Sequence, residues 1–492
     1  MVKMTAKGTA VRCLVFDLGA GSGRAVLCRF DGIRLDFEEI HRFSGIERRL
    51  PDGPHWDIAR LFAEIETGLA RAAECGGPVD AIGVDGWGLD YLLIDRQGRP
   101  LGDPFHYRHP RSMRGHAAFP IPEQRLFEET GAQSLPLKTL YQLLDECASA
   151  PERIARASAL LMIADAVNHH LTGSVSGERT LARTSGLLDI RTGEWSATLL
   201  AEAGLPGHLL PPLLTPGTVC GPLRPALADA LVWPPVPVVA VAGHDTASAV
   251  AALPPGPDRA FLICGSWSLI GVERVAPVLT EAARRDGFGN EGGVEDRLCL
   301  IRSLNGLHLL RRLLEAWRLR TGEAVAFADL AGRIAAAAGV DPTIAIDPAD
   351  PRYFDPDDMA ATVIADLEER GLAADADLGR LALAVYRGLA ADAVAAFDAL
   401  ERHHGAPIRS LQICGGGAHD EVLCGMIASA LSVPVSIGPV EASVCGNALL
   451  QLIGIGAIAD LAEGRDLVQR SLPFRDYDPM TRSWTTRPYA GH

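Results

Sequence analysis

The chain has 492 residues, of which 48% are hydrophobic and 22% are charged, so we expect a well-packed globular protein of two domains, not a disordered or fibrous one. Its 46 lysines and arginines and 61 aspartates and glutamates give a net charge of −15, which argues against nucleic acid or an anionic membrane as partner. No apolar run reaches membrane-spanning length, the ten cysteines form no C-x-x-C pair, and the N-terminus lacks a secretion signal, so we expect a cytoplasmic protein.

Lysine occurs only at positions 3, 7 and 138. A Walker A loop requires the sequence G-K-[ST], and a protein-kinase site requires a lysine on a strand of the ATP site. Neither pattern occurs in this chain. Any ATP site must therefore hold its phosphates in another way.

The first predicted elements are two strand-like runs, residues 13–19 and 24–30, which flank a small glycine turn and form a β-hairpin. The motif across this turn is Asp17-Leu-Gly-Ala-Gly-Ser-Gly-Arg24. Small residues in a tight turn allow backbone N–H groups to wrap a polyphosphate, and an arginine adds charge. The candidate ATP contacts are Ala20, Gly21, Ser22, Gly23 and Arg24. Asp17 is a candidate to hold Mg²⁺ through water, because this ion dehydrates reluctantly. An ordinary glycine hairpin is the alternative, whereas a dinucleotide fingerprint would need glycine at position 24 and a following helix.

A helix over residues 58–74 and a strand over residues 81–85 come next, and the strand runs into Asp85-Gly-Trp-Gly-Leu-Asp90. The segment Tyr107-Arg108-His109-Pro-Arg111 lies further along the chain. Aromatic rings stack on the apolar faces of sugars, and charged side chains bind sugar hydroxyls, so Trp87 and Arg108 are candidate sugar contacts. The alternative for Trp87 is that it anchors the strand to the core.

A further helix is predicted over residues 155–172, ended by Gly173. Prolines then crowd residues 206–237, and a strand leads into Gly243-His-Asp-Thr246. The carboxylate of Asp245, where a strand gives way to a helix, either caps the helix, which is worth about 1 kcal/mol, or points at a substrate hydroxyl. In phosphoryl transfer, one carboxylate commonly orients and deprotonates the acceptor.

The pattern of strand, small-residue turn and strand recurs over residues 260–272, where Ser266 is a candidate phosphate donor. A long helix is expected over residues 378–403. A strand over residues 411–414 then runs through Gly415-Gly-Gly417 into a helix over residues 421–431. Three glycines make room for a base and ribose beside a helix N-terminus, whereas a tight turn needs only one.

Both halves of the chain open with a hairpin, which indicates an ancient duplication. We place the boundary between the halves near residues 250–257, with domains 1–250 and 251–492. The first domain is expected to hold the sugar, the first phosphate hairpin and Asp245, and the second is expected to hold the nucleotide.

The order of these motifs resembles that of the FGGY carbohydrate kinases, which belong to the superfamily of actin, hexokinase and the chaperone ATPases. The likeness spans nearly the whole chain, and within the family it is strongest to the kinases of L-rhamnulose. Besides the motifs above, the stretches that carry it are Glu39-Ile-His-Arg-Phe43, Thr139-Leu-Tyr-Gln-Leu143, residues 238–250, Asn290-Glu-Gly-Gly293, Pro439-Val-Glu-Ala-Ser443 and Gly446-Asn447.

The resemblance implies an α/β fold of two actin-like, ribonuclease H-like domains with an interdomain cleft. It implies transfer of the γ-phosphoryl of ATP, with Mg²⁺, to a ketose, with Asp245 as general base. Gly88, His244 and Thr246 then lie at the sugar, and Ser266 keeps the hydroxyl of a family threonine. At the nucleotide, the resemblance places Gly416, Ser303 and Arg311, the last two in place of the family's Asn and Gln, with Asn305 near the first.

Two departures from the family pattern concern sugar specificity. Gly86 replaces a threonine, and His109 replaces an aspartate. A sugar hydroxyl that loses a matched partner costs about 1–3 kcal/mol, so L-fuculose or a pentulose is an alternative substrate. Outside this class, a non-catalytic nucleotide-dependent scaffold and a dinucleotide oxidoreductase are the competing hypotheses, and the oligomeric state stays open.

Overall fold

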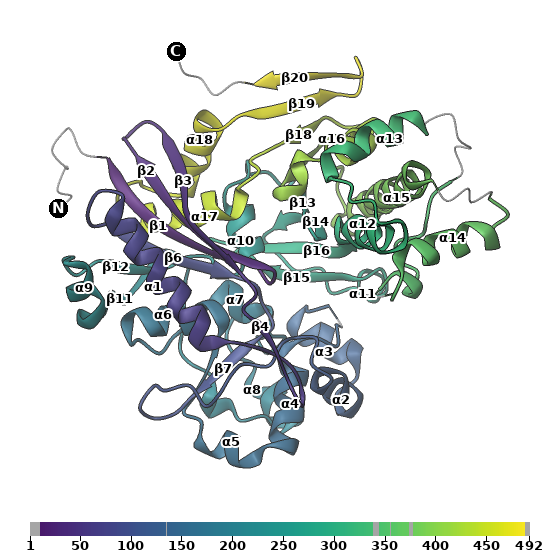
Figure 1. Ribbon diagram of the computed structural model, residues 1–492. Coiled ribbons are helices and arrows are strands. Elements are labelled where there is room, and N and C mark those ends of the chain that lie inside the picture. Colours follow the sequence, from purple (N-terminus) through teal and green to yellow (C-terminus); the bar gives the residue numbers. More distant parts are fainter. Residues whose placement is uncertain (1–9, 134, 338–343, 355, 373–376, 488–492) are drawn as a thin grey trace.

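The computed structural model describes residues 10–133, 135–337, 344–354, 356–372 and 377–487. Residues 1–9, which hold two of the three lysines and most of the polar N-terminus, lie outside these ranges. Each half of the chain contributes one large β-sheet, and helices pack beside both sheets (Figure 1).

The sheet of the N-terminal half has six strands in the order β11-β12-β6-β1-β2-β3. Their bounds are β1 Val11–Leu18, β2 Ser22–Phe30, β3 Leu35–Ser44, β6 Ala81–Gly86, β11 Thr218–Pro222 and β12 Pro237–Ala240. β1 and β2 form the predicted hairpin, and Asp17 pairs with Arg24 across it. β6 lies parallel to both β1 and β12, and it is buried along its whole length because both faces of the sheet are covered.

The sheet of the C-terminal half has eight strands in the order β15-β16-β14-β13-β17-β18-β19-β20. Their bounds are β13 Arg259–Cys264, β14 Trp267–Arg274, β15 Phe288–Gly292, β16 Leu298–Asn305, β17 Ser410–Cys414, β18 Val435–Ile437, β19 Phe474–Asp478 and β20 Ser483–Arg487. β13 and β14 form the second predicted hairpin.

The two sheets repeat one topology. In the first, β3, β2 and β1 are antiparallel neighbours, and β6 and β12 continue parallel to β1. In the second, β16, β14 and β13 are antiparallel neighbours, and β17 and β18 continue parallel to β13. This shared order of five strands is what the expected duplication requires.

The helices of the N-terminal half are α1 Ile58–Glu74, α2 Arg111–Ala118, α3 Glu123–Thr130, α4 Thr139–Ser149, α5 Pro151–Arg156, α6 Ile163–Thr172, α7 Arg179–Arg183, α8 Ala197–Ala203, α9 Pro225–Leu231 and α10 Asp245–Ala251. Its short strands are β4 Glu47–Leu50, β5 Gly53–Trp56, β7 Tyr91–Ile94, β8 Ala159–Met162, β9 Gly177–Glu178 and β10 Leu213–Leu214. The predicted helix over residues 58–74 is confirmed.

The predicted helix over residues 155–172 is wrong in its first half. Residues 159–162 form β8, which pairs with β7. The predicted helix is therefore split between the end of α5 at residues 155–156 and α6 from residue 163. The run Ala-Leu-Leu-Met fits a buried strand as well as a helix, and pairing with β7 decides between them. Gly173 ends the helix as predicted, in the left-handed conformation.

The helices of the C-terminal half are α11 Glu281–Arg285, α12 His308–Thr321, α13 Leu330–Ala336, α14 Met359–Glu369, α15 Leu378–His404, α16 Glu421–Ala430, α17 Ala442–Gly454 and α18 Leu461–Ser471. Short 3-10 helices lie at Gly207–Leu209, Phe327–Asp329, Pro351–Tyr353 and Gly416–His419. The helices predicted over residues 378–403 and 421–431 are confirmed within one residue.

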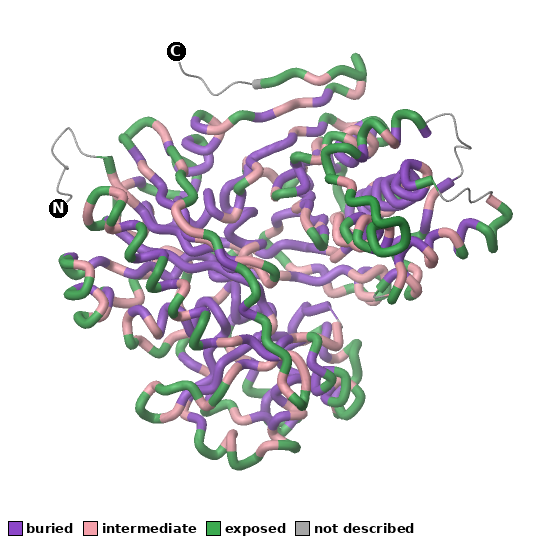
Figure 2. The backbone as a smooth tube through the Cα atoms, viewed as in Figure 1, coloured by how far each residue is buried: buried purple, intermediate pink, exposed green. Residues whose placement is uncertain are grey.

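Two helices from the end of the chain belong spatially to the first sheet. The hydrophobic core beside β1 and β12 includes side chains of α17 and α18, among them Val444, Ala448 and Leu467. In Figure 1 these yellow helices lie next to the purple strands, and Figure 2 shows the tube buried where they meet. The C-terminal half therefore supplies part of the environment of the first sheet.

Candidate active site

Three aspartates lie at or just after the carboxyl ends of three neighbouring parallel strands. Asp17 and Asp85 are register partners near the ends of β1 and β6, and Asp245 opens α10 just after β12. The segments are tied together, because Gly86 N–H donates to the Gly243 carbonyl at 2.9 Å. Ligands of open α/β sheets bind at this edge, so the sheet itself gathers the three carboxylates at a binding position.

Asp245 is held by its neighbour and is open on another side. Its Oδ1 accepts from the backbone N–H of Thr246 at 2.6 Å and from the Thr246 hydroxyl at 3.3 Å. His244 occupies the cap position, and its side chain makes no capping bond. The Asp245 side chain is 36% exposed, although many protein atoms surround its carboxyl group, and His244 Nε2 lies 3.5 Å from its Oδ1. Burial raises the pKa of Asp245; the neighbouring His244 opposes this shift, and the charge of Asp17 adds to it. These features suit a proton acceptor better than a helix cap.

Arg24 and Asp17 are bound to each other. Arg24 donates to Asp17 Oδ2 from Nη2 at 2.6 Å and from Nε at 2.9 Å, and its Nη2 also contacts Glu441 at 2.5 Å. Burial alone would lower the pKa of the Arg24 guanidinium, but the two carboxylates outweigh burial and raise it. The predicted phosphate arginine is therefore partly neutralised in this structure.

Asp85 opens the motif that was expected at the sugar, but it was not among the predicted site residues. The residue is fully buried, its Oδ2 accepts from Asn447 Nδ2 at 2.5 Å, and its buried Oδ1 has no hydrogen-bond partner. Burial, and after it the charge of Asp17, raises the pKa of Asp85 well above its usual range. An aspartate in an apolar strand was the available sequence signal, but its partner lies 362 residues away.

The carboxylate cluster fits a hydrated Mg²⁺. No three His, Cys, Asp or Glu side chains form a metal cage within the described part of the chain, but Mg²⁺ commonly uses one or two carboxylates together with waters and phosphates. The unpartnered Asp85 Oδ1 and the raised pKa values of Asp85 and Asp245 mark an excess of negative charge. A cation near Asp17 would relieve that excess.

Among the predicted sugar residues, Trp87 is mainly a core residue. Its indole is 6% exposed, packs against Trp56 at 4.5 Å and donates from Nε1 to Asp90 at 3.1 Å. Gly88 is buried, and a Cβ there would lie 2.6 Å from Thr184 Oγ1, so only glycine fits. Leu89 follows with φ of 79°, a left-handed conformation that non-glycine residues rarely adopt outside functional segments.

Arg108 and His109 have different surroundings. The Arg108 side chain is exposed and lies 5.7 Å from the Tyr107 ring. His109 is buried between the rings of Phe105 and His55, at centroid distances of 4.8 and 5.6 Å. Burial lowers the pKa of His109, so the position that holds an aspartate in the family pattern carries a neutral packed ring here.

In the C-terminal half, a glycine follows each of the three strands that correspond to β1, β6 and β12. β13, β17 and β18 end at Cys264, Cys414 and Ile437, and the residues that come next are Gly265, Gly415 and Gly438. A Cβ on Gly416, or on Gly21 in the first hairpin, would meet no atom within 4 Å. Such open backbone suits the phosphates and ribose of a nucleotide.

The surroundings of three further residues in the two hairpins, Gly23, Ser266 and Trp267, are well defined. A Cβ on Gly23 would overlap the ring of Phe43, so this glycine is required for packing. Ser266 is exposed in the second hairpin. Beside it, Trp267 is 40% exposed and lies against His308 at 4.8 Å, a surface that the sequence reasoning missed although an exposed aromatic residue in a glycine turn was the signal.

The predicted nucleotide residues Ser303 and Arg311, with Asn305 near the first, have different surroundings on β16 and α12. Ser303 donates to Gln133 Oε1 at 3.4 Å, and the Arg311 side chain is exposed on α12. Asn305 donates to the Pro348 carbonyl at 2.5 Å, while its buried Oδ1 has no partner. Asn305 therefore keeps one acceptor that a ligand could use.

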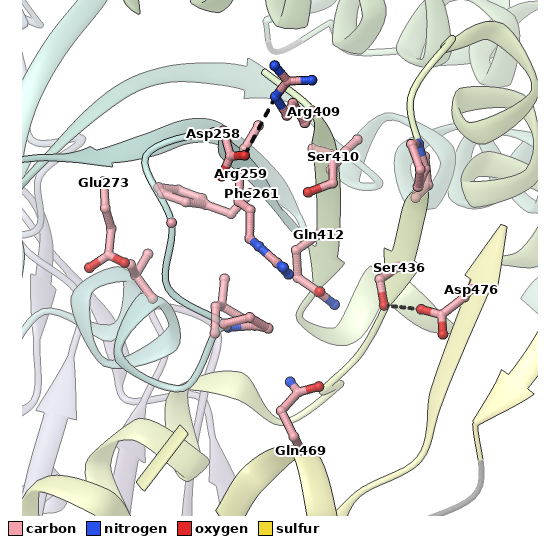
Figure 3. A pocket seen from close by; sticks show the side chains of 18 residues that line it. Asp258, Arg259, Phe261, Glu273, Arg409, Ser410, Gln412, Ser436, Gln469 and Asp476 are labelled. Atoms are coloured by element: carbon pink, nitrogen blue, oxygen red, sulfur yellow. Dashed lines mark hydrogen bonds and ion pairs between the residues drawn. The ribbon is translucent and has the colours of Figure 1, made fainter. Parts of the chain in front are cut away.

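A cavity of about 590 Å³ lies where β13 and β17 begin, at the ends of these strands opposite to Gly265 and Gly415 (Figure 3). It is lined by Arg259 and Ser410, where β13 and β17 begin, and by Gln469 of α18. None of the predicted site residues lines it. The cavity is therefore separate from the carboxylate cluster.

Family models of the FGGY carbohydrate kinases match residues 12–252 with the N-terminal domain and residues 260–455 with the C-terminal domain. The chain is 34% identical over 475 residues to "Rhamnulokinase" of Yersinia pestis bv. Antiqua (strain Angola), with 96% of each chain covered. It is 35% identical over 482 residues to "Rhamnulokinase" of Klebsiella pneumoniae (strain 342), again with 96% of each chain covered.

Solved structures share the fold at low sequence identity. Xylulose kinase from Rhodospirillum rubrum has a TM-score of 0.74 at 21% identity, covering 93% of this chain and 92% of that one. Glycerol kinase from Plasmodium falciparum has a TM-score of 0.75 at 15% identity, covering 95% and 94%. No helix in the described ranges is long and apolar enough to cross a membrane. The two-domain actin-like α/β architecture is confirmed, and the chain belongs to the FGGY family of carbohydrate kinases.

Proposed function

We propose that this carbohydrate kinase phosphorylates L-rhamnulose to L-rhamnulose 1-phosphate, with ATP and Mg²⁺. The observation that carries the proposal is Asp245, a deep but accessible carboxylate at the strand ends that also carry Asp17 and Asp85. The relatives named rhamnulokinase, 34–35% identical over nearly the whole chain, support this sugar. We further propose that the functional domains are residues 1–250 and 251–492.

In the proposed mechanism, the sugar binds beside Gly88, His244 and Thr246. The Thr246 N–H fixes one oxygen of Asp245. The carboxylate takes the proton of the sugar hydroxyl while the hydroxyl oxygen attacks the γ-phosphorus of ATP and the bond from that phosphorus to ADP breaks. Residues 20–24 and Ser266 hold phosphates, and Gly416 leaves space for ribose. MgATP supplies the phosphoryl group and the cation that offsets its charge, and Asp17 would hold that cation through water.

A panel of ketoses tests the proposed sugar. L-Rhamnulose should stimulate ADP release with kcat/KM at least about tenfold higher than L-fuculose, L-ribulose, L-xylulose, D-xylulose or glycerol, because a site built for one set of hydroxyls leaves its own polar groups unpaired with another. Faster turnover of L-fuculose or a pentulose would show that this sugar, and not L-rhamnulose, is the substrate. Gly86 and His109, which depart from the family pattern, make this the main alternative. ATP binding without sugar-stimulated ADP release would favour a non-catalytic scaffold.

A further inference from the structure

One face of α17 carries three polar side chains in the protein interior. Ser443, Asn447 and Gln451 are spaced four residues apart, so they share one side of the helix. Asn447 and Gln451 are fully buried, and Ser443 is half-buried. A polar stripe in this position is unusual because apolar side chains would be easier to bury against a sheet.

Each side chain of this stripe donates to the first sheet. Ser443 Oγ donates to Asp17 Oδ2 at 3.1 Å, and Asn447 Nδ2 donates to Asp85 Oδ2 at 2.5 Å. Gln451 Nε2 donates to the Leu14 carbonyl at 3.0 Å and to Asn447 Oδ1 at 2.7 Å. The bonds from Ser443 and Asn447 end on carboxylates of the candidate active site, and the bond from Gln451 Nε2 to Asn447 Oδ1 fixes the orientation of the Asn447 amide.

Glycines on both sides bring α17 close enough for these bonds. A Cβ on Gly83 of β6 would lie 2.5 Å from Asn447 Oδ1 and 2.8 Å from Gln451 Nε2. A Cβ on Gly446 would overlap the carbonyl oxygen of Ser248 in α10, the helix that begins with Asp245. The same helix therefore contacts the elements that carry all three aspartates, with hydrogen bonds to two and backbone packing near the third.

We propose that Ser443 and Asn447 are positioning residues, through which the C-terminal half sets the orientation of the Asp17 and Asp85 carboxylates for the metal-bound phosphates. Gln451 holds Asn447 in the rotamer that this requires. The inference rests on the proposed role of Asp17. It gives Ser443 and Asn447, which belong to stretches that resemble the family, a specific role in the site. Hydrogen-bond partners of metal ligands commonly change metal affinity or activity by 10–100-fold.

The test measures ATP affinity with and without Mg²⁺ by calorimetry, together with kcat and thermal unfolding. In Ser443→Ala, the gain in ATP affinity on adding Mg²⁺ should shrink by about tenfold, while affinity for metal-free ATP stays near that of the wild type. In Asn447→Leu, kcat should fall by about 10–100-fold, with a smaller change in the KM for ATP. Cys445→Ala, in the same helix but in the apolar core, is the control that should change neither quantity.

A purely structural stripe predicts a different pattern. Ser443→Ala and Asn447→Leu would then lower the melting temperature but leave the Mg²⁺-dependent gain and kcat within about twofold of Cys445→Ala, and that result would overturn the proposal. If Asn447→Leu does not fold, Ser443→Ala still tests the proposal, because Ser443 is only half-buried and its loss should be tolerated. A wild type that phosphorylates no sugar would instead contradict the proposed function, so the two failures are distinguishable.

Discussion

The Asp245→Asn variant should bind ATP as well as the wild type but phosphorylate sugar about 10²–10⁴-fold more slowly, because an amide cannot accept the proton of the acceptor hydroxyl. The substitution keeps the size of the side chain and one oxygen for the Thr246 N–H, so the start of α10 should stay in place. Stopped-flow or coupled measurement of kcat, with ATP affinity measured by calorimetry, separates chemistry from binding.

Asp258→Asn is the matched control, since this half-buried carboxylate lines the cavity at the opposite strand ends. It should leave kcat near the wild-type value. Near-normal turnover by Asp245→Asn would remove Asp245 as the base and return it to the helix-cap interpretation.

The Gly446→Ala variant should destabilise the protein by about 3 kcal/mol or more, or prevent folding, because a single methyl group has no room between α17 and α10. The added carbon would overlap the Ser248 carbonyl oxygen, which belongs to backbone and cannot rotate away. Urea unfolding followed by circular dichroism measures the change in free energy of unfolding.

Gly425→Ala in α16 is the opposite case, since a Cβ there would meet no atom within 4 Å. This variant should be neutral or stabilise the protein by roughly 0.5–1 kcal/mol through the better helix propensity of alanine. Equal stabilities of the two variants would show that Gly446 of α17 does not lie against the Ser248 carbonyl of α10.

The two hairpins and the strand that leads to Asp245 were predictable from sequence, because alternation between apolar strands and small-residue turns is a local signal. The run at residues 159–162 was not, since four apolar residues fit a helix or a strand and only β7 decides. Trp87 shows the same limit, because its burial against Trp56 depends on packing that no local pattern encodes.

Some residues of the candidate site were likewise predictable from local sequence, and others were not. Asp17 and Asp245 stand at the ends of predicted strands, so their place at one sheet edge follows from topology. The bond between Asp85 and Asn447 joins residues 362 positions apart, and one sequence gives no means of pairing them. Arg24 was expected at phosphates. Its bond to Asp17 follows from their pairing across the hairpin, whereas its contact with Glu441 depends on where α17 packs.

The most direct measurement is a crystal structure with L-rhamnulose and a non-hydrolysable ATP analogue with Mg²⁺. We predict an oxygen of Asp245 about 2.6–3.2 Å from the hydroxyl that faces the γ-phosphate, with that phosphate between residues 20–24 and Ser266. A sugar bound with its reactive hydroxyl beyond hydrogen-bond reach of Asp245, or beside a different base, would contradict the account.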